Sequence, residues 1–304
     1  MPPPSGPAAI FDRRLVRQRR ERAAPGLTGV GFLIEEVASR LVERLAEVRR
    51  EFPVALVLGG HRGIVARAAL PLAGGAGLVI ADTSRGMLEG CPGLLVAADE
   101  EAMPFGADRF DLVLGCQTLH WVNDLPGTLA QLRYCLKPDG LLLAALPGGE
   151  TLAGLQAAFL EAELELEGGA GLRVSPFLDV REAGSLLQRA GFALPMVDVD
   201  RIRVSYPDPL ALLRDLRAMG ETSALLERRR GTLRRETLAR ALSLYAERHV
   251  DVQRAGEGRV YANVDVLFLT AWKPHASQPR PLRPGSGRVD LAAALEAGGD
   301  PANA

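Results

Sequence analysis

Five short apolar segments alternate with helical stretches over the first half of the chain, and this alternation constrains the fold more than any other feature. The segments are 54–58, 77–81, 94–98, 110–115 and 141–145. Continuous short apolar runs are typical of strands buried on both faces, and the helices between them imply parallel pairing. The sequence therefore predicts an α/β fold with helices on both faces of a parallel sheet.

The second half of the chain adds further elements to this sheet. We expect strands at 197–204 and 264–272, and helices at 150–165, 181–190, 210–219 and 234–249. The Pro- and Gly-rich sequence after Lys273 carries no such pattern. These segments predict seven strands in all, with helical insertions after the fifth and sixth strands.

The charge balance and the length of the apolar runs exclude several functional classes. The 304 residues include 36 basic and 37 acidic side chains, which argues against binding dominated by nucleic-acid phosphates or anionic lipid. The longest apolar runs, such as 141–147, are far shorter than the roughly 20 residues that a membrane helix needs. The three cysteines lack a CxxC spacing, and no signal-peptide-like stretch opens the chain. We therefore expect a cytoplasmic protein with no integral membrane segment and no nucleic-acid partner.

Glycines and acids follow three consecutive strands, at the edge where parallel sheets bind ligands. Gly59, Gly60 and Gly63 follow the first strand, Asp82 ends the second and Asp99 ends the third. Glycine lets the backbone approach a ligand where a side chain would clash. An acid after the second strand can accept from both hydroxyls of a ribose, and an acid after the third can accept from the adenine amine. A tight turn, a helix cap and a solvated acidic loop are the structural alternatives.

This combination resembles the class I S-adenosylmethionine-dependent methyltransferases. The segments 98–105 (ADEEAMPF) and 109–113 (RFDLV) look like motifs of that superfamily around the third and fourth strands. The resemblance implies a Rossmann-like, seven-stranded, mostly parallel sheet with S-adenosyl-L-methionine as the cofactor. The cofactor contacts that it implies are Gly59, Gly60, Gly63, Asp82, Asp99, Glu100 and Cys116.

A longer series of motifs resembles the complex I assembly factor 5 family and its bacterial relatives. In chain order the motifs are FDR at 11–13, ADEEAMPF at 98–105, LHWVNDLP at 119–126, LKPDG at 136–140, SPF at 175–177, MGE at 219–221 and WK at 272–273, followed by His275. Together they extend over roughly residues 11–285. The mitochondrial member is described as hydroxylating an arginine on an iron–sulfur subunit of respiratory complex I. The resemblance therefore implies an enzyme with a protein substrate in complex I assembly.

We expect three segments along the chain: a flexible Arg-rich arm over 1–32, a methyltransferase-like domain over 33–273 and a disordered tail over 274–304. The arm holds six arginines between Phe11 and Arg22. Such a run suits a solvated helix, or else an arm for a partner or a lid on a site. A second arginine cluster, at 228–240, suits either a solvated surface or recognition of an acidic partner.

Two residues depart from the superfamily pattern. Val57 stands where an acid usually ends the first strand, and His61 replaces the middle glycine of the loop. A histidine there crowds the methionine half of the cofactor or takes a positive φ, so we expect weakened cofactor binding. Two alternative functions remain: a small-molecule or carrier-protein methyltransferase, and a non-catalytic assembly chaperone with a degenerate loop.

His120 is the candidate catalytic residue, because it follows the fourth strand, where this superfamily places substrate contacts. It suits a general base, and the alternative is a structural histidine beside Trp121. The His249-Val250-Asp251 sequence with a distal His275 has the appearance of an iron-binding triad. It ends a helix and lacks strand context, so we expect no metal site.

Overall fold

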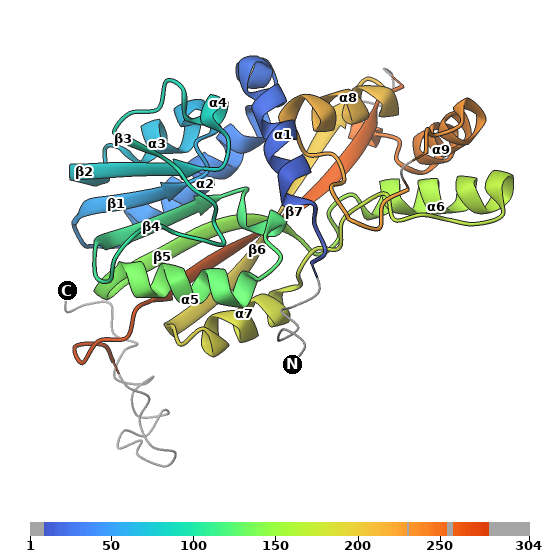
Figure 1. Ribbon diagram of the computed structural model, residues 1–304. Helices are drawn as coiled ribbons and strands as arrows, with labels where there is room; N and C mark the ends of the chain where they lie inside the picture. Colours follow the sequence, from blue (N-terminus) through green and yellow to red (C-terminus); the bar gives the residue numbers. More distant parts are fainter. Residues whose placement is uncertain (1–8, 230, 254–257, 280–304) are drawn as a thin grey trace, which may run out of the picture. The chain divides into compact units, whose positions relative to one another are not determined.

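One seven-stranded sheet forms the centre of the protein, in the strand order β3-β2-β1-β4-β5-β7-β6 (Figure 1). The computed structural model describes residues 9–229, 231–253 and 258–279. The strands are β1 (Phe52–Leu58), β2 (Ala73–Asp82), β3 (Leu94–Ala97), β4 (Phe110–Cys116), β5 (Leu136–Gly148), β6 (Ala193–Tyr206) and β7 (Val260–Trp272). β7 is antiparallel to both of its neighbours, β5 and β6, and the other pairs are parallel. The predicted α/β, mostly parallel seven-stranded sheet is therefore confirmed.

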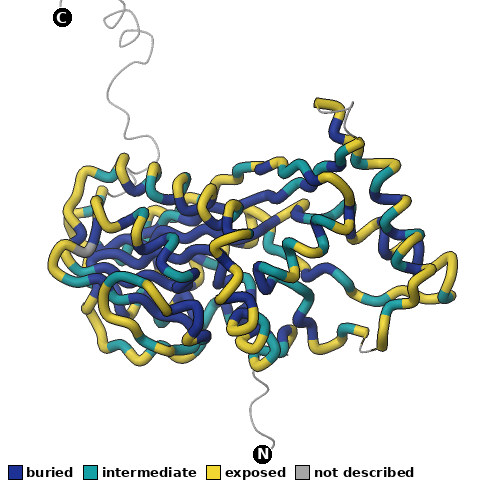
Figure 2. Tube along the Cα trace, turned by 90° about the horizontal axis from the view of Figure 1, so that it is seen from above, coloured by how far each residue is buried: buried dark blue, intermediate teal, exposed yellow. Residues whose placement is uncertain are grey.

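The central strands are apolar on both faces because helices cover both sides. In β1, Ala55 and Val57 face one core cluster, and Leu56 and Leu58 face the other. Helix α2 (Phe32–Ala46) covers the first face and repeats its buried residues every three or four positions. Helices α5 (Leu125–Cys135) and α7 (Val180–Arg189) cover the second face (Figure 1). Figure 2 shows the resulting continuous buried centre along the strands.

Three helices form a further layer at the far ends of β6 and β7. They are α6 (Ala153–Glu167), α8 (Pro209–Met219) and α9 (Arg235–Arg248), and they share a separate apolar cluster with Tyr206 and Val260. Helices α6 and α9 lie side by side in both views (Figures 1 and 2). The shorter elements are η1 (Ala24–Gly29), η2 (His61–Gly63), α3 (Ile64–Ala69), α4 (Arg85–Leu88) and η3 (Leu119–Trp121). Helices α6 and α7 follow β5, and helices α8 and α9 follow β6, so the helical insertions lie where the sequence predicts them.

The N-terminal segment differs from the flexible arm expected over residues 1–32. Residues 13–23 form helix α1 (Arg13–Ala23), whose first turn is capped by the Asp12 carboxylate. The helix buries Val16, Arg20 and Ala23, which share one face at helical spacing. The backbone N–H of Asp12 donates to the Ala224 carbonyl oxygen at 2.8 Å. The segment is thus part of the folded unit, and of the expected arm only residues 1–8 lie outside the described part.

The compact unit extends to Pro274, one residue beyond the expected domain boundary, and His275 begins a second unit. Of the expected tail, residues 280–304 lie outside the described residues. Among the helices that the structure describes, none is both long enough and apolar enough to cross a bilayer.

Candidate functional site

The loop after β1 turns sharply against the ends of β2 and β4. Gly59 has a φ of 90° and Gly63 a φ of 82°, which L-residues with side chains rarely adopt. A Cβ on Gly59 would lie 2.6 Å from Thr118 Cγ2, and one on Gly60 would lie 2.4 Å from the Met87 carbonyl oxygen. Close packing therefore requires glycine at positions 59 and 60. The loop is a tight turn, and neighbouring atoms of Thr118 and Met87 leave no room there for a side chain.

His61 fills the space in the middle of this loop. The residue is 1% exposed, its Nε2 lies 2.8 Å from the Cys116 carbonyl oxygen, and its φ is 40°. Burial, together with the charge of Arg20, lowers the pKa of His61 to about 4. The imidazole is therefore neutral near pH 7, and its side chain lies between Gly59 and the end of β4. The expected positive φ at this position is confirmed.

Asp82 lies at the end of β2 and accepts four hydrogen bonds. Arg20 of α1 donates from Nη2 to Asp82 Oδ2 at 2.6 Å and from Nε to Asp82 Oδ1 at 3.4 Å. The backbone N–H groups of Gly60 and Ser84 donate to Oδ2 and Oδ1, each at 2.8 Å. A carboxylate has about four lone-pair sites, so these donors saturate Asp82. Burial opposes the negative charge, but Arg20 outweighs it and holds the pKa of Asp82 below its ordinary value.

The acids after β3 are also paired with an arginine of α1. Arg13 Nη2 donates to Asp99 Oδ1 at 2.6 Å and to Glu100 Oε2. The Glu100 side chain is buried, which raises its pKa, whereas Asp99 remains partly exposed. Both predicted acids therefore lie at this edge of the sheet, joined by one guanidinium.

Helix α1 thus places two arginines over the two strand ends that the sequence assigned to a cofactor. Arg13 and Arg20 are seven residues apart, or about two helical turns, so they project from one face of α1. The acceptors at Asp82, Asp99 and Glu100 have the chemistry to bind the ribose hydroxyls and adenine amine of S-adenosylmethionine. Since Asp82 has no acceptor site left, the ribose hydroxyls can bind to it only when Arg20 releases it. This arrangement favours the lid among the alternatives for the arginine-rich segment.

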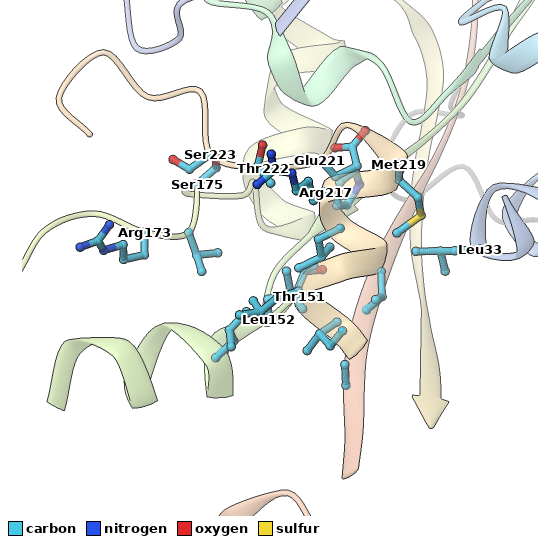
Figure 3. A pocket seen from close by; sticks show the side chains of 18 of the residues that line it. Leu33, Thr151, Leu152, Arg173, Ser175, Arg217, Met219, Glu221, Thr222 and Ser223 are labelled. Carbon is cyan, nitrogen blue, oxygen red and sulfur yellow. The ribbon is translucent and has the colours of Figure 1, made fainter. Parts of the chain in front are cut away.

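A cavity of about 470 Å³ adjoins this edge of the sheet, between α6, α8 and the ends of β5 and β7 (Figure 3). His120 lines it, as do Gln117 and Glu221. His120 Nε2 lies 3.0 Å from Glu221 Oε2, and Trp121 Nε1 donates to the same oxygen at 3.2 Å. Burial opposes ionisation of Glu221, but His120 and Arg20 outweigh it and lower the pKa of that carboxyl. Because a carboxylate can only accept, Nε2 is the nitrogen of His120 that donates to Glu221.

Cys116 differs from the other implied cofactor contacts in how it is placed. Its side chain is fully buried in the core, and burial raises the pKa of the thiol to about 12. The carbonyl oxygen of Cys116, rather than its thiol, contacts the loop through His61. The residue contributes to the site through its backbone.

No group of three or more His, Cys, Asp or Glu side chains within the described residues could hold a metal ion. His249 stacks on Tyr245 with ring centroids 4.3 Å apart, and its Nδ1 lies 3.2 Å from the Tyr245 carbonyl oxygen. Asp251 instead pairs with Arg203 at 3.2 Å. These two residues have separate structural contacts.

Reasoning from the sequence missed three residues that the structure places at this site: Arg13, Arg20 and Glu221. Arg13 and Glu221 belong to motifs of the family resemblance, which gave them no role. Arg20 differs from its neighbours in one detectable way, because it lies four residues after Val16 and three before Ala23 on an apolar stripe.

The fold and the glycine–acid site at its strand ends define a protein of the class I methyltransferase type. Residues 31–195 match the family described as methyltransferase domain. A Bacillus subtilis structure, YcgJ, shares the fold at 14% identity with a TM-score of 0.50, over 81% of this chain and 98% of that one. The phosphoethanolamine N-methyltransferase 2 of Haemonchus contortus, solved with S-adenosylhomocysteine, gives a TM-score of 0.50 at 16% identity, over 86% of this chain and 60% of that one.

The chain belongs to the family of the arginine-hydroxylase NDUFAF5. It is 39% identical to the Danio rerio mitochondrial protein over 93% of this chain and 88% of the relative, and 40% identical to the human protein over 93% and 82%. A malonyl-[acyl-carrier protein] O-methyltransferase of Halorhodospira halophila is 33% identical over 94% of this chain and 96% of the relative. The predicted family is therefore confirmed, and the carrier-protein methyltransferases are related to it.

Proposed function

We propose that this protein is an S-adenosylmethionine-dependent enzyme that modifies a protein subunit, an arginine being the expected target, in the assembly of respiratory complex I. The observation that carries the proposal is the pair of acidic strand ends at Asp82 and Asp99, beside a glycine loop and the cavity of His120. The 38–40% identity to arginine-hydroxylases of the NDUFAF5 family supports the protein substrate. The methyltransferase relatives support the cofactor.

The cofactor would be held by groups already at the strand ends. Asp82 would accept from the ribose hydroxyls, Asp99 and Glu100 from the adenine amine, and the backbone at Gly59 and Gly63 would lie along the methionine part. S-adenosylmethionine supplies an electrophilic methyl group when it is bound. Binding of the ribose requires Arg20 to leave Asp82, so movement of the Arg20 side chain precedes or accompanies it.

His120 and Glu221 would handle a proton of the substrate. The Glu221 carboxylate accepts from Nε2 and fixes the ring, so Nδ1 is the nitrogen that would exchange a proton with the substrate. Nδ1 is buried and has no hydrogen-bond partner among the described residues. It is therefore available to a substrate group in the cavity, which His120 also lines.

Isothermal titration of S-adenosylmethionine and S-adenosylhomocysteine tests the cofactor site. We expect binding by the wild type, loss of it in Asp82→Ala, and no change in Asp198→Ala, a partly exposed acid on β6. Arg20→Met should bind at least about tenfold more tightly, equivalent to about 1.4 kcal/mol, because it removes the competitor for Asp82. Absence of heat and of thermal stabilisation at millimolar ligand, in both wild type and Arg20→Met, would support the non-catalytic chaperone instead.

The reaction is tested with an iron–sulfur subunit of complex I and mass spectrometry of its arginine peptides. A mass gain of one methylene identifies methyl transfer, and a gain of one oxygen identifies hydroxylation. His120→Asn should lose either product while it still binds the cofactor. Turnover of free small acceptors without modification of the subunit would contradict the protein substrate.

A carrier protein with a bound acyl group is the second candidate substrate. The apolar wall of the cavity favours it, as does the 30–33% identity to malonyl-[acyl-carrier protein] O-methyltransferases. Methylation of a malonyl-carrier protein in the same assay, with the complex I subunit unmodified, would select this candidate.

A further inference from the structure

A basic cleft adjoins the cavity, and the two share Arg173 and Ser223. The cleft has a volume of about 500 Å³. The described residues that line it are Arg19, Leu172, Arg173, Ser223, Arg228 and Arg229. Four of these six are arginines and none is an acid, so every charged side chain in the lining itself is positive.

The body of the cavity is lined by aliphatic and aromatic side chains. Leu152, Leu155 and Phe159 come from the α6 side, and Leu212 and Leu213 come from α8. Figure 3 shows Leu152 and Thr151 near the start of α6, apart from the polar group of Glu221, Thr222, Ser223 and Ser175. A cavity of about 470 Å³ is within the usual size of small-molecule sites. Its polarity changes from one end to the other, which suits a ligand with a chain and a polar head.

Several polar atoms at the polar end have no hydrogen-bond partner within the described residues. They are Gln117 Nε2, His120 Nδ1 and Ser223 Oγ. Gln117 is 8% exposed and the His120 side chain is 3% exposed, and both line the cavity. Buried polar atoms are normally paired, so these atoms indicate a polar ligand group between the apolar body and the cleft.

The arginines of the cleft differ in how far their charge is compensated. Arg173 and Arg229 pair with Glu163, which is fully buried behind them. Arg19 donates to the carbonyl oxygens of Thr222 and Ser223, and in the described part of the chain no carboxylate lies within ion-pair distance of it. Arg228 lies 3.7 Å from the Asp12 carboxylate. Burial and repulsion by Arg228 lower the pKa of Arg19, and Asp12 offsets only part of this effect. A bound anion would relieve this repulsion.

We propose that the cavity and cleft together bind a single-chain amphiphile, with its aliphatic chain in the cavity and a phosphate head between Arg19 and Arg228. Guanidinium groups bind phosphate oxygens through several charge-assisted hydrogen bonds, which favours phosphate for a cleft with several arginines. The inference deepens the proposed function, because it names a ligand class for the cavity beside the cofactor site. Phosphopantetheine thioesters and lysophospholipids both have this chemistry.

The test is titration calorimetry of the full chain, without S-adenosylmethionine, so that its failure and failure of the cofactor site are separate results. The probes are dodecyl phosphate, dodecanol and inorganic phosphate, all below micellar concentrations. We expect dodecyl phosphate to bind at least about tenfold more tightly than either of the other two. Equal affinity for dodecanol and dodecyl phosphate, or no binding of dodecyl phosphate, would overturn the proposal.

Two variants assign the two halves of the ligand. Arg19→Gln with Arg228→Gln should abolish the tenfold preference for dodecyl phosphate over dodecanol, while Arg181→Gln, an exposed arginine on α7, should keep it. Leu213→Trp should fill the cavity and remove binding of both, while Leu160→Trp, which is exposed on α6, should not. An unchanged preference in the double arginine variant would refute the head position.

Two further probes distinguish the sources of the ligand. Tighter binding of lauroyl-coenzyme A than of lysophosphatidic acid would support a phosphopantetheine thioester, and the reverse order would support a lipid. Either result requires the same dependence on Arg19 and Leu213. Binding that ignores both side chains would place the ligand elsewhere and overturn the inference.

Discussion

His61 makes the stability of this protein depend on pH in a calculable way. The ordinary pKa of histidine is 6.5, and burial and Arg20 lower that of His61 to about 4. Between these values the unfolded chain binds more protons than the folded chain, so the free energy of unfolding rises with pH. The contribution of His61 is fully present above pH 6.5 and is lost as the pH falls toward 4.

The size of this contribution follows from the two pKa values. A difference of 2.5 units at about 1.36 kcal/mol per unit gives about 3 kcal/mol when the transition is complete. Between about pH 7 and about pH 4.5, most of the transition has occurred, so the expected loss is roughly 2 kcal/mol. Carboxylates also titrate in this range, so the contribution of His61 must be isolated by comparison.

The comparison is with His61→Asn, measured by urea denaturation with tryptophan fluorescence at both pH values. Asparagine tolerates a positive φ and does not titrate, so the difference in the free energy of unfolding between wild type and variant should shrink by roughly 2 kcal/mol on acidification. Leu194→Asn is the matched control, because Leu194 also has a positive φ, 50°, and is exposed. Curves for wild type and His61→Asn that stay parallel between the two pH values would refute a buried neutral imidazole in the loop.

Three further outcomes follow from the site geometry. Arg20→Ala should lower the free energy of unfolding by roughly 3–5 kcal/mol, because Asp82 would be left as an uncompensated buried charge. Arg14→Ala, on the exposed face of α1, should change the free energy of unfolding by less than about 0.5 kcal/mol. Equal effects of the two variants in urea denaturation would contradict the buried pair of Arg20 and Asp82. Gly59→Ala should cost roughly 1–3 kcal/mol in the same assay, because the φ of 90° is strained for alanine; an unchanged midpoint would show that the loop can relax. Cys116 should resist iodoacetamide near pH 8 in the folded protein and react in urea, since burial raises its pKa to about 12; peptide mass spectrometry that finds it alkylated without urea would contradict its burial.

The sheet and the acidic strand ends could be predicted because their signal is local. A run such as 141–145 is apolar without alternation, and this pattern at this length is typical of a strand covered on both faces. Asp82 and Asp99 follow two such runs directly, so their meeting at one edge of the sheet follows from parallel topology.

The position of helix α1 over that edge could not be predicted, because its contacts connect distant parts of the chain. Arg20 lies 62 residues before Asp82, and an arginine-dense helix has the same composition whether it is solvated or buried. Glu221 pairs with His120 across 101 residues. Periodicity describes which face of a helix is apolar, but it does not say which strand end that face will meet.

The backbone contacts between residues 10–12 and residues 224–226 have a consequence for how the chain folds during synthesis. Phe11 forms an isolated bridge with Leu225, and the Leu226 N–H donates to the Ile10 carbonyl oxygen at 2.9 Å. Helix α1 leaves the ribosome long before these residues are translated, at roughly 5–20 residues per second. Residues 224–226 can therefore fasten the start of α1 only after the strand ends at Asp82 and Asp99 have been translated, so these backbone contacts are the last of the contacts around α1 to form.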